Sequence, residues 1–246
     1  MKPLIFISML FSLSINNYAQ STKVKAKKTT SIPENFIVKD TSGTIYQPEI
    51  WEKLLMTGYY YLAAENSNDK NTAYLLIRRS EEEREAVLAK SPQPMETKSF
   101  TTGKEVKSFT ARDITGKKYK LKALKGKIVI LNFWFINCPP CRNEILELNK
   151  LVADYKDSTN IIFLAIALDN KEDLKRFLKN NPLNSSIIAN GEYITFRYNI
   201  AVYPTHVVID QEGKAYFHTS GAGSVIIYWL KKSIDELVGK KVEIPQ

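Results

Sequence analysis

The chain has 246 residues, a formal net charge of +9 at pH 7 and only two cysteines. So few cysteines exclude a scaffold held together by several disulfides. Nine lysines fall between Lys98 and Lys127, and a basic cluster of this kind can attract nucleic acid or an anionic membrane surface. Because no RNA- or DNA-binding motif accompanies it, we interpret the cluster as a solvated face and expect no nucleic-acid partner.

Residues 1–19 have the pattern of a secretory signal peptide. Lys2 precedes an apolar core, Leu4–Ile15, and cleavage is expected after Ala19. A retained membrane anchor is the alternative, but the apolar core is shorter than the roughly 20 residues that a spanning helix needs. We therefore predict export with no stable membrane insertion after cleavage. Residues 20–31 are polar and lysine-rich, which predicts a flexible lead-in.

Residues 32–95 are predicted to form a small α+β region that ends in a linker at Pro92 and Pro94. At about sixty residues, it lies near the lower size limit for independent folding. Its three consecutive tyrosines, at 59–61, are read either as a partner-recognition surface or, as we favour, as half-buried strand residues. The predicted elements are a helix over Glu49–Thr57, strands over Tyr59–Ala63 and Ala73–Arg78 around the polar turn Asn66–Asn71, and a helix from its N-cap Ser80 through Lys90.

Residues 96–246 alternate between strand and helix patterns. The apolar run Ile128–Phe133 suits a buried central strand, and apolar residues at three- and four-residue steps up to Tyr155 predict a helix after it. This alternation indicates an α/β sandwich. The other predicted elements are a hairpin of Ser108–Ile114 and Lys118–Leu121, a strand at Ile161–Leu168, a helix at Lys171–Asn180, a connection through Ile187–Ile188 and Tyr193–Tyr198, strands at Thr205–Asp210 and Lys214–Thr219, and a closing helix at Ser224–Val238.

Cys138 and Cys141 stand where the central strand ends and the helix begins. A thiolate at a helix N-terminus faces unpaired N–H groups and the positive end of the helix dipole, so Cys138 is the predicted activated sulfur. Cys141 is close enough in the chain to resolve a mixed disulfide formed by Cys138. A zinc site is the competing reading, but His206 and His218 are far away in the sequence, and we expect no metal.

The string Phe133-Trp134-x-x-x-Cys138-Pro-Pro-Cys141-Arg142-x-Glu144 resembles that of thioredoxin-fold oxidoreductases. The resemblance is to the TlpA/ResA-like branch, within the AhpC/TSA-Redoxin-like thioredoxin superfamily, and covers roughly Ser108 to Val238. It implies a thioredoxin fold, with a central mixed sheet flanked by helices, in residues 96–246. Residues 32–95 are then an added extension. Since this branch is exported from bacterial cells, the resemblance also implies the periplasm.

The resemblance also suggests several site residues beyond the cysteines. Pro204 matches a cis-proline beside the sulfurs, and Tyr203 would line the substrate groove. Glu144 matches a glutamate near the sulfurs, and we leave open whether it relays a proton for Cys141 or is a solvated first-turn acid. Trp134 is expected beside the site, in a substrate-binding or a plain core role. Arg142 is expected at the surface, and His206 is expected as a half-buried strand histidine. Two residues depart from the family pattern: Asn132 stands in place of a buried acid, and Asn137 in place of a tryptophan.

These features together predict an exported thiol:disulfide oxidoreductase without a bound cofactor. By resemblance, it would reduce disulfides in protein substrates, such as those of cytochrome c maturation, and would be recharged by a thiol donor in the membrane. The residues alone do not fix the direction, since an oxidase or isomerase would keep both cysteines and the proline. A different alternative is a non-catalytic binding module of the cell envelope that uses residues 32–90 as its contact surface.

Overall fold

The computed structural model describes residues 36–66 and 73–240. The predicted signal peptide, the lead-in and most of the polar turn at Asn66–Asn71 lie outside the described residues. Everything described belongs to one compact unit, Asn35–Gln246. Within the described residues, no helix has the length and apolar character needed to span a bilayer.

A five-stranded mixed sheet forms the centre of the fold, in the order β11-β10-β7-β8-β9. All seven residues of β7 are buried, as expected for a strand covered on both faces. β7 runs parallel to β8, and β8 parallel to β9, whereas β10 is antiparallel to both β7 and β11. The strands are β7 (Ile128–Trp134), β8 (Ile161–Ala167), β9 (Ser186–Ile188), β10 (Thr205–Ile209) and β11 (Ala215–Ser220). This sheet confirms the predicted thioredoxin fold.

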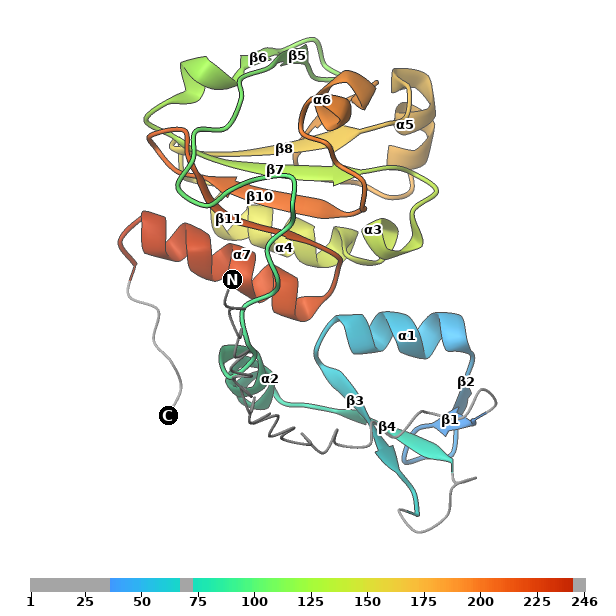
Figure 1. Cartoon of the computed structure of the whole chain (residues 1–246). Helices are drawn as coiled ribbons and strands as arrows, with labels where there is room; N and C mark the ends of the chain where they lie inside the picture. The colour runs from blue at the N-terminus through green and yellow to red at the C-terminus, as the bar shows by residue number, and fades with distance from the viewer. Residues whose placement is uncertain (1–35, 67–72, 241–246) are drawn as a thin grey trace, which may run out of the picture. The chain divides into compact units, whose positions relative to one another are not determined.

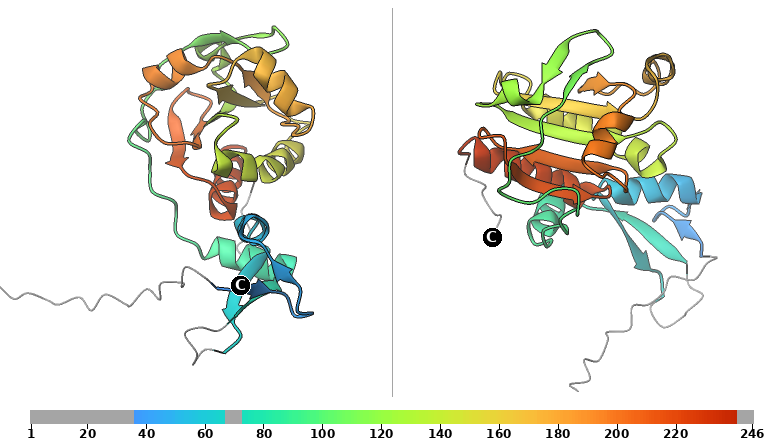
Figure 2. Two further views of the ribbon diagram at one scale, coloured as in Figure 1. Left: turned by 90° about the vertical axis from the view of Figure 1, so that its right-hand side faces the viewer. Right: turned by 45° about the horizontal axis from the view of Figure 1, so that its top comes forward.

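Alternation along the strands sorts side chains into two layers of core. On β7, Ile128, Ile130 and Trp134 join one buried cluster with residues of helices α4 (Ile145–Asp154) and α7 (Ser224–Leu237). The intervening β7 residues join the second cluster, with helix α6 (Glu192–Arg197), the short helix η1 (Leu121–Leu124) and the segment around hairpin β5 (Thr110–Arg112) and β6 (Lys118–Lys120). Figures 1 and 2 show these layers on opposite faces of the sheet. Asn132 shares the parity of Ile130 and therefore faces the α4 side.

The helix predicted after the central strand is divided in two. Helix α3 covers Pro139–Asn143, and α4 follows, with Glu144 as the residue between them. Helix α5 (Lys171–Leu178) begins at its N-cap Asn170, whose side chain accepts the backbone N–H of Asp173. The aromatic segment that was predicted only as a connection forms α6. The strand after the proline, the hairpin and the closing helix lie within two residues of their predicted bounds.

The N-terminal extension contains a sheet of its own, in the order β2-β1-β4-β3. Strands β1 (Val38–Lys39) and β2 (Ile45–Tyr46) were not predicted, because two residues are too few for a periodic pattern. The predicted helices and strands are confirmed as α1 (Pro48–Met56), β3 (Tyr60–Ala64), β4 (Tyr74–Arg78) and α2 (Glu81–Ala89). The predicted N-cap is also confirmed, since Ser80 forms a capping box with Glu83.

Contacts to α4 and α7 join this extension to the helices of the thioredoxin fold. Arg84 of α2 is buried, and its guanidinium lies 3.5 Å from the Glu147 carboxylate of α4. Gly58, which follows α1, approaches α7 so closely that a Cβ atom there would lie 2.7 Å from the Ser224 hydroxyl oxygen. Its positive φ of 75° favours glycine for a second reason. The extension therefore packs against the helical layer that contains α4 and α7.

Candidate active site

Cys138 and Cys141 form a disulfide at the N-terminus of α3, with their Cα atoms 5.3 Å apart. Cys138 is the N-cap of the helix, and its sulfur accepts the backbone N–H of Cys141 at 3.3 Å. Pro139 and Pro140 occupy the next two positions, where the missing N–H groups have no helical acceptor. The same N–H and the helix dipole would stabilise a thiolate on Cys138 after reduction. The assignment of Cys138 as the activated sulfur therefore stays a prediction, and its place as the N-cap of α3 supports it.

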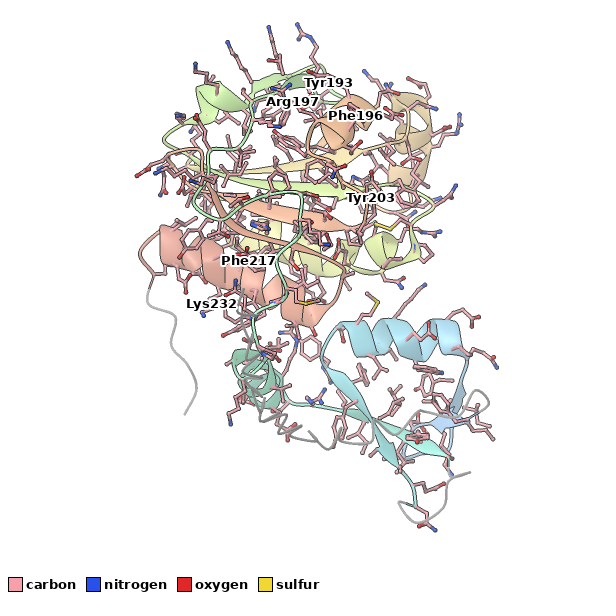
Figure 3. The ribbon with its side chains drawn as sticks, viewed as in Figure 1. Tyr193, Phe196, Arg197, Tyr203, Phe217 and Lys232 are labelled. Atoms are coloured by element: carbon pink, nitrogen blue, oxygen red, sulfur yellow. A yellow bond between two sulfur atoms is a disulfide. The ribbon has the colours of Figure 1, made fainter. Side chains whose placement is uncertain are left out.

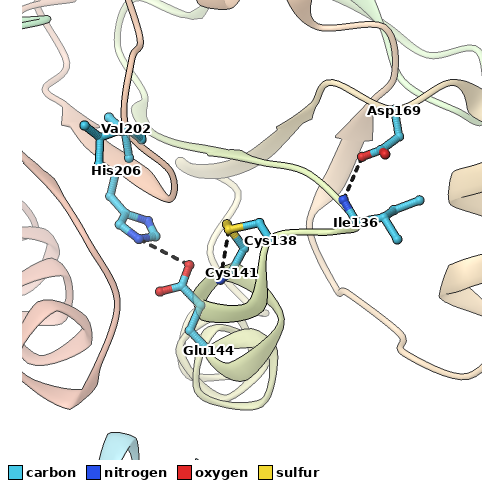
Figure 4. Close-up of a disulfide and its surroundings, with 8 residues drawn as sticks. Ile136, Cys138, Cys141, Glu144, Asp169, Val202 and His206 are labelled. Atoms are coloured by element: carbon cyan, nitrogen blue, oxygen red, sulfur yellow. Dashed lines mark hydrogen bonds and ion pairs between the residues drawn. A yellow bond between two sulfur atoms is a disulfide. The ribbon is translucent and has the colours of Figure 1, made fainter.

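The loop before the disulfide is held by Asp169, a residue that was not predicted to belong to the site. The backbone N–H of Ile136 donates to the Asp169 carboxylate at 2.8 Å (Figure 4). Asp169 follows β8, which lies parallel to β7, so the carboxyl ends of both strands meet at this edge. The sequence did contain one sign of this role, since Asp169 is a carboxylate that comes just after a buried strand. Asn137 is exposed between this anchor and the disulfide.

The peptide bond between Tyr203 and Pro204 is cis, as the resemblance implied. Thr205, the next residue, pairs with Phe133 of β7, which places the proline beside the end of the strand that leads to the cysteines. Tyr203 is half-buried, and its ring lies edge-on to Phe135 with the centroids 5.3 Å apart. Figure 3 shows Tyr203 just before β10, near the disulfide-bearing turn.

Glu144 and His206 form a contact inside the protein next to this site. Glu144 is 2% exposed and His206 is 0% exposed, and the His206 Nε2 atom lies 3.3 Å from the Glu144 Oε1 atom. Burial raises the pKa of Glu144, and the nearby imidazole offsets part of that rise. The alternative of a solvated acid at Glu144 is therefore wrong. The expectation of a half-buried His206 is also wrong, because no part of its side chain reaches solvent.

Asn132 completes a buried polar cluster with Glu144 and His206. It pairs with His206 across β7 and β10, a register that places the two Cβ atoms about 4.5–5.5 Å apart. Within the described residues, several polar atoms of the cluster lack a well-aligned hydrogen bond: the Asn132 Oδ1 atom, both Glu144 carboxylate oxygens and both His206 ring nitrogens. Because unpaired polar groups are costly in a core, their accumulation beside the Cys138–Cys141 disulfide marks this place as a candidate functional site.

Trp134 and Arg142 have supporting positions. Trp134 is 1% exposed and packs against Phe177 with the ring centroids 5.9 Å apart, so of its two predicted roles the structure shows the core one. Arg142 is exposed, with its guanidinium carbon 5.6 Å from the centre of the Phe177 ring. In the part of the chain that the structure describes, no three His, Cys, Asp or Glu side chains are grouped as metal ligands.

A groove of about 600 Å³ lies between α1 of the extension and the helices α3 and α4. Pro139 and Arg142 of α3, with Leu146 of α4, line one side of the groove. Ile50 and Leu54 of α1 line the other side. Leu146 and Ile50 are both largely exposed. The extension thus forms one wall of a groove that reaches the residue next to Cys138.

Comparison with known proteins places this site in a family. The profile of the AhpC/TSA family matches residues 102–217. The thiol-disulfide oxidoreductase ResA of Bacillus anthracis is 40% identical over 116 residues, which cover 46% of this chain and 65% of that protein. ResA of Halalkalibacterium halodurans is 31% identical over 121 residues, which cover 48% of this chain and 69% of that protein. The chain thus spans just under two thirds of the Bacillus relative.

A solved structure shows the same fold. The crystal structure assigned as the thiol:disulfide interchange protein DsbE of Chlorobium tepidum aligns with a TM-score of 0.52 and 26% sequence identity, and the alignment covers 57% of this chain and 99% of that one. The residues matched by the family profile include the central strand, the Cys138–Cys141 turn and the cis-proline described above. The chain therefore belongs to the ResA-like family of thioredoxin-fold thiol-disulfide oxidoreductases.

Proposed function

We propose that this protein is a thiol:disulfide oxidoreductase that reduces disulfides in protein substrates outside the cytoplasm. One observation carries the proposal: the chain's two cysteines are joined at a helix N-terminus, where a backbone N–H already points at the Cys138 sulfur. A structural staple is the weaker explanation, because so short a loop restrains the unfolded chain little.

The reaction begins on the reduced protein, with the Cys138 thiolate. It attacks a substrate disulfide, forms a mixed disulfide and releases the first substrate sulfur as a thiolate. Cys141 then attacks the Cys138 sulfur, closes the disulfide seen here and releases the second substrate sulfur. Two electrons pass to the substrate, so no bound cofactor is required. Tyr203 and Pro204 are proposed to hold the substrate chain, since they lie beside the end of β7 that leads to the cysteines and a backbone segment there can pair with an extended substrate.

Glu144 is proposed to take the proton that Cys141 loses before its attack. It follows Cys141 by three residues along the helix, so the two side chains share a face with Cβ atoms roughly 5–6 Å apart. Burial raises the pKa of its carboxyl group, which brings that group closer to the pKa of a thiol. A buried carboxyl of this kind can return the proton when the disulfide is reduced again.

We base the proposed direction of electron flow and the proposed donor on the family resemblance. A reductase must be recharged, and a thiol donor embedded in the membrane would do this for an exported protein. Disulfides of cytochrome c maturation substrates are one proposed target. Equilibration against glutathione tests the direction: a potential near or below about −220 mV favours a reductase, and one near −120 mV an oxidant.

Trapping of the mixed disulfide tests the activity itself. The C141A variant should accumulate a mixed disulfide with insulin chains, and the wild-type protein should reduce insulin with dithiothreitol as donor. C138A is the matched control and should do neither, because the attacking sulfur is gone. If the wild-type protein exchanges with no disulfide, the binding-module alternative replaces this proposal.

A further inference from the structure

The buried histidine of the site, His206, has no role in the exchange steps above. It lies on β10, two residues after the cis-proline, with its side chain wholly buried. Its Nε2 atom is 3.3 Å from the Glu144 Oε1 atom, and Figure 4 shows the carboxylate and the imidazole pointing toward each other. A histidine in an apolar core normally has a neutral, hydrogen-bonded partner. Here the partner of His206 is the carboxyl group of Glu144, the residue between α3 and α4.

We propose that His206 is a positioning residue that shares one proton with Glu144 and so enables Cys141 to ionise. The inference rests on the proposed exchange function. It concerns only the second chemical step, in which Cys141 resolves the mixed disulfide.

Charge balance supports a shared proton. A buried carboxylate alone or a buried imidazolium alone would be strongly disfavoured in this core. With one proton between them, the pair is neutral in either arrangement: carboxylic acid with neutral imidazole, or carboxylate with imidazolium. The disulfide form described here is the form in which the pair should hold that proton, because Cys141 has already given it up.

In the mixed disulfide, Cys141 is a thiol and the Glu144–His206 pair is a carboxylate that accepts a hydrogen bond from neutral imidazole. The Cys141 proton then moves to this pair and neutralises it. The Cys141 sulfur then bonds to the Cys138 sulfur, the bond from Cys138 to the substrate sulfur breaks, and the substrate leaves as a thiolate with the electron pair of that bond. When a donor reduces the disulfide again, Cys141 is the leaving thiolate and recovers the proton from the pair.

The surroundings of Glu144 leave His206 as its titratable partner. On α3, the two cysteines lie close to Glu144 (Figure 4). On β7, the residue paired with His206 is Asn132, which does not titrate. On α4, Glu147 is instead paired with Arg84 and Lys150. In the disulfide form, the imidazole of His206 is the titratable side chain among the described residues that lowers the pKa of Glu144. Removal of the imidazole should therefore change the proton balance of the pair directly.

Stopped-flow exchange with 5,5′-dithiobis(2-nitrobenzoate) separates the two steps. The reduced protein should release one coloured thiolate when Cys138 attacks and a second when Cys141 resolves. In H206Q, we expect the second phase to slow about tenfold or more at pH 7, while the first phase is unchanged. The pH midpoint of the second phase should rise toward about 8.5, the value of an ordinary thiol. Glutamine can hydrogen-bond to Glu144 but cannot hold its proton.

His218 provides the matched control. It is the other fully buried histidine, but it lies on β11, where it pairs with Val207 of β10. Its side chain contacts Thr102 rather than Glu144. H218Q should leave the second phase and its pH midpoint unchanged.

Three results would overturn the inference: an unchanged second phase in H206Q, an equal loss of both phases, or the same change in H218Q. The first would mean that a hydrogen bond alone is sufficient, and the other two would indicate a general structural effect. If the wild-type protein shows no first phase, the proposed function itself fails, which is a separate and recognisable outcome.

Discussion

The most informative residues of this protein are polar groups placed where the strand pattern leads one to expect apolar ones. Asn132 and His206 occupy core-facing positions of β7 and β10. Glu144, at the break between α3 and α4, contacts His206. Each is unfavourable in an apolar core by itself. Their grouping beside the Cys138–Cys141 disulfide supports the proposed proton transfer, since groups with altered pKa values cluster at functional sites.

The buried carboxyl group of Glu144 should make stability depend on pH. Its folded-state pKa is raised by burial, so folding favours the protonated form. Its contribution is fully present below the ordinary pKa of glutamate and is lost as the pH rises through the raised folded value. E144Q should therefore be more stable than the wild type at pH 7, by about 1.4 kcal/mol for each tenfold difference in the acid constant of Glu144 between the folded and unfolded states. Urea unfolding of the disulfide form at pH 4 and pH 7 measures this.

The control for this prediction is E172Q. Glu172 is exposed on α5, so its replacement should change stability equally little at both pH values. A stability gain of E144Q that is no larger at pH 7 than at pH 4 would contradict the assigned burial effect.

The sequence predicts the site incompletely, and the reason is visible at these residues. Cys138, Cys141 and Pro204 are recognisable because their chemistry depends on local position, at a helix start or before a strand. The partnership of Glu144 with His206 depends on the register between β7 and β10 and on the break between α3 and α4. No periodic pattern encodes either feature. The same applies to Asp169, which reaches the Ile136 N–H across the edge of the sheet.

At the scale of elements, long and strongly patterned segments were predicted well. β7, β8 and α7 have continuous apolar runs or stripes, which identify them without knowledge of their neighbours. α6 was predicted only as a connection, because its six residues are stabilised by packing of Ile194 and Tyr198 into the second core cluster rather than by helical pattern.

The start of α2 allows a test of the predicted N-cap, Ser80. Ser80 accepts the Glu83 N–H at 3.2 Å, and the Glu83 carboxylate accepts the Ser80 N–H at 2.9 Å. S80A removes the first of these bonds and should lower the free energy of unfolding by about 1 kcal/mol, as measured by urea denaturation. S80D retains an acceptor at the N-cap and should stay near the wild type. Equal losses in both variants would show that the cap does not stabilise this helix.

At the scale of the whole molecule, one arginine links three elements. The Nε atom of Arg84 donates to the carbonyl oxygen of Thr57 at 2.9 Å, and its guanidinium lies against the Glu147 carboxylate and 4.5 Å from the centre of the Tyr59 ring. The arginine is 8% exposed, so these contacts are largely shielded from water. Loss of a buried pair lowers stability more than loss of an exposed ion pair, because the polar partner that remains is buried without its hydrogen bond.

Loss of this arginine should therefore weaken the docking of the extension more than the thioredoxin fold. R84M keeps much of the side-chain length but removes the donor to the Thr57 carbonyl oxygen. Among the described residues, Glu147 then keeps Lys150 as its ion-pair partner. We expect a loss of about 1–3 kcal/mol in unfolding free energy. Proteinase K should cut within residues 36–90 faster than in the wild type, while the disulfide-bearing domain stays intact. R176M removes an exposed ion pair with Asp173 on α5 and should change neither quantity. If R84M and R176M behave alike, the buried arginine does not hold the extension in place, and the groove beside Cys138 would lack a fixed wall.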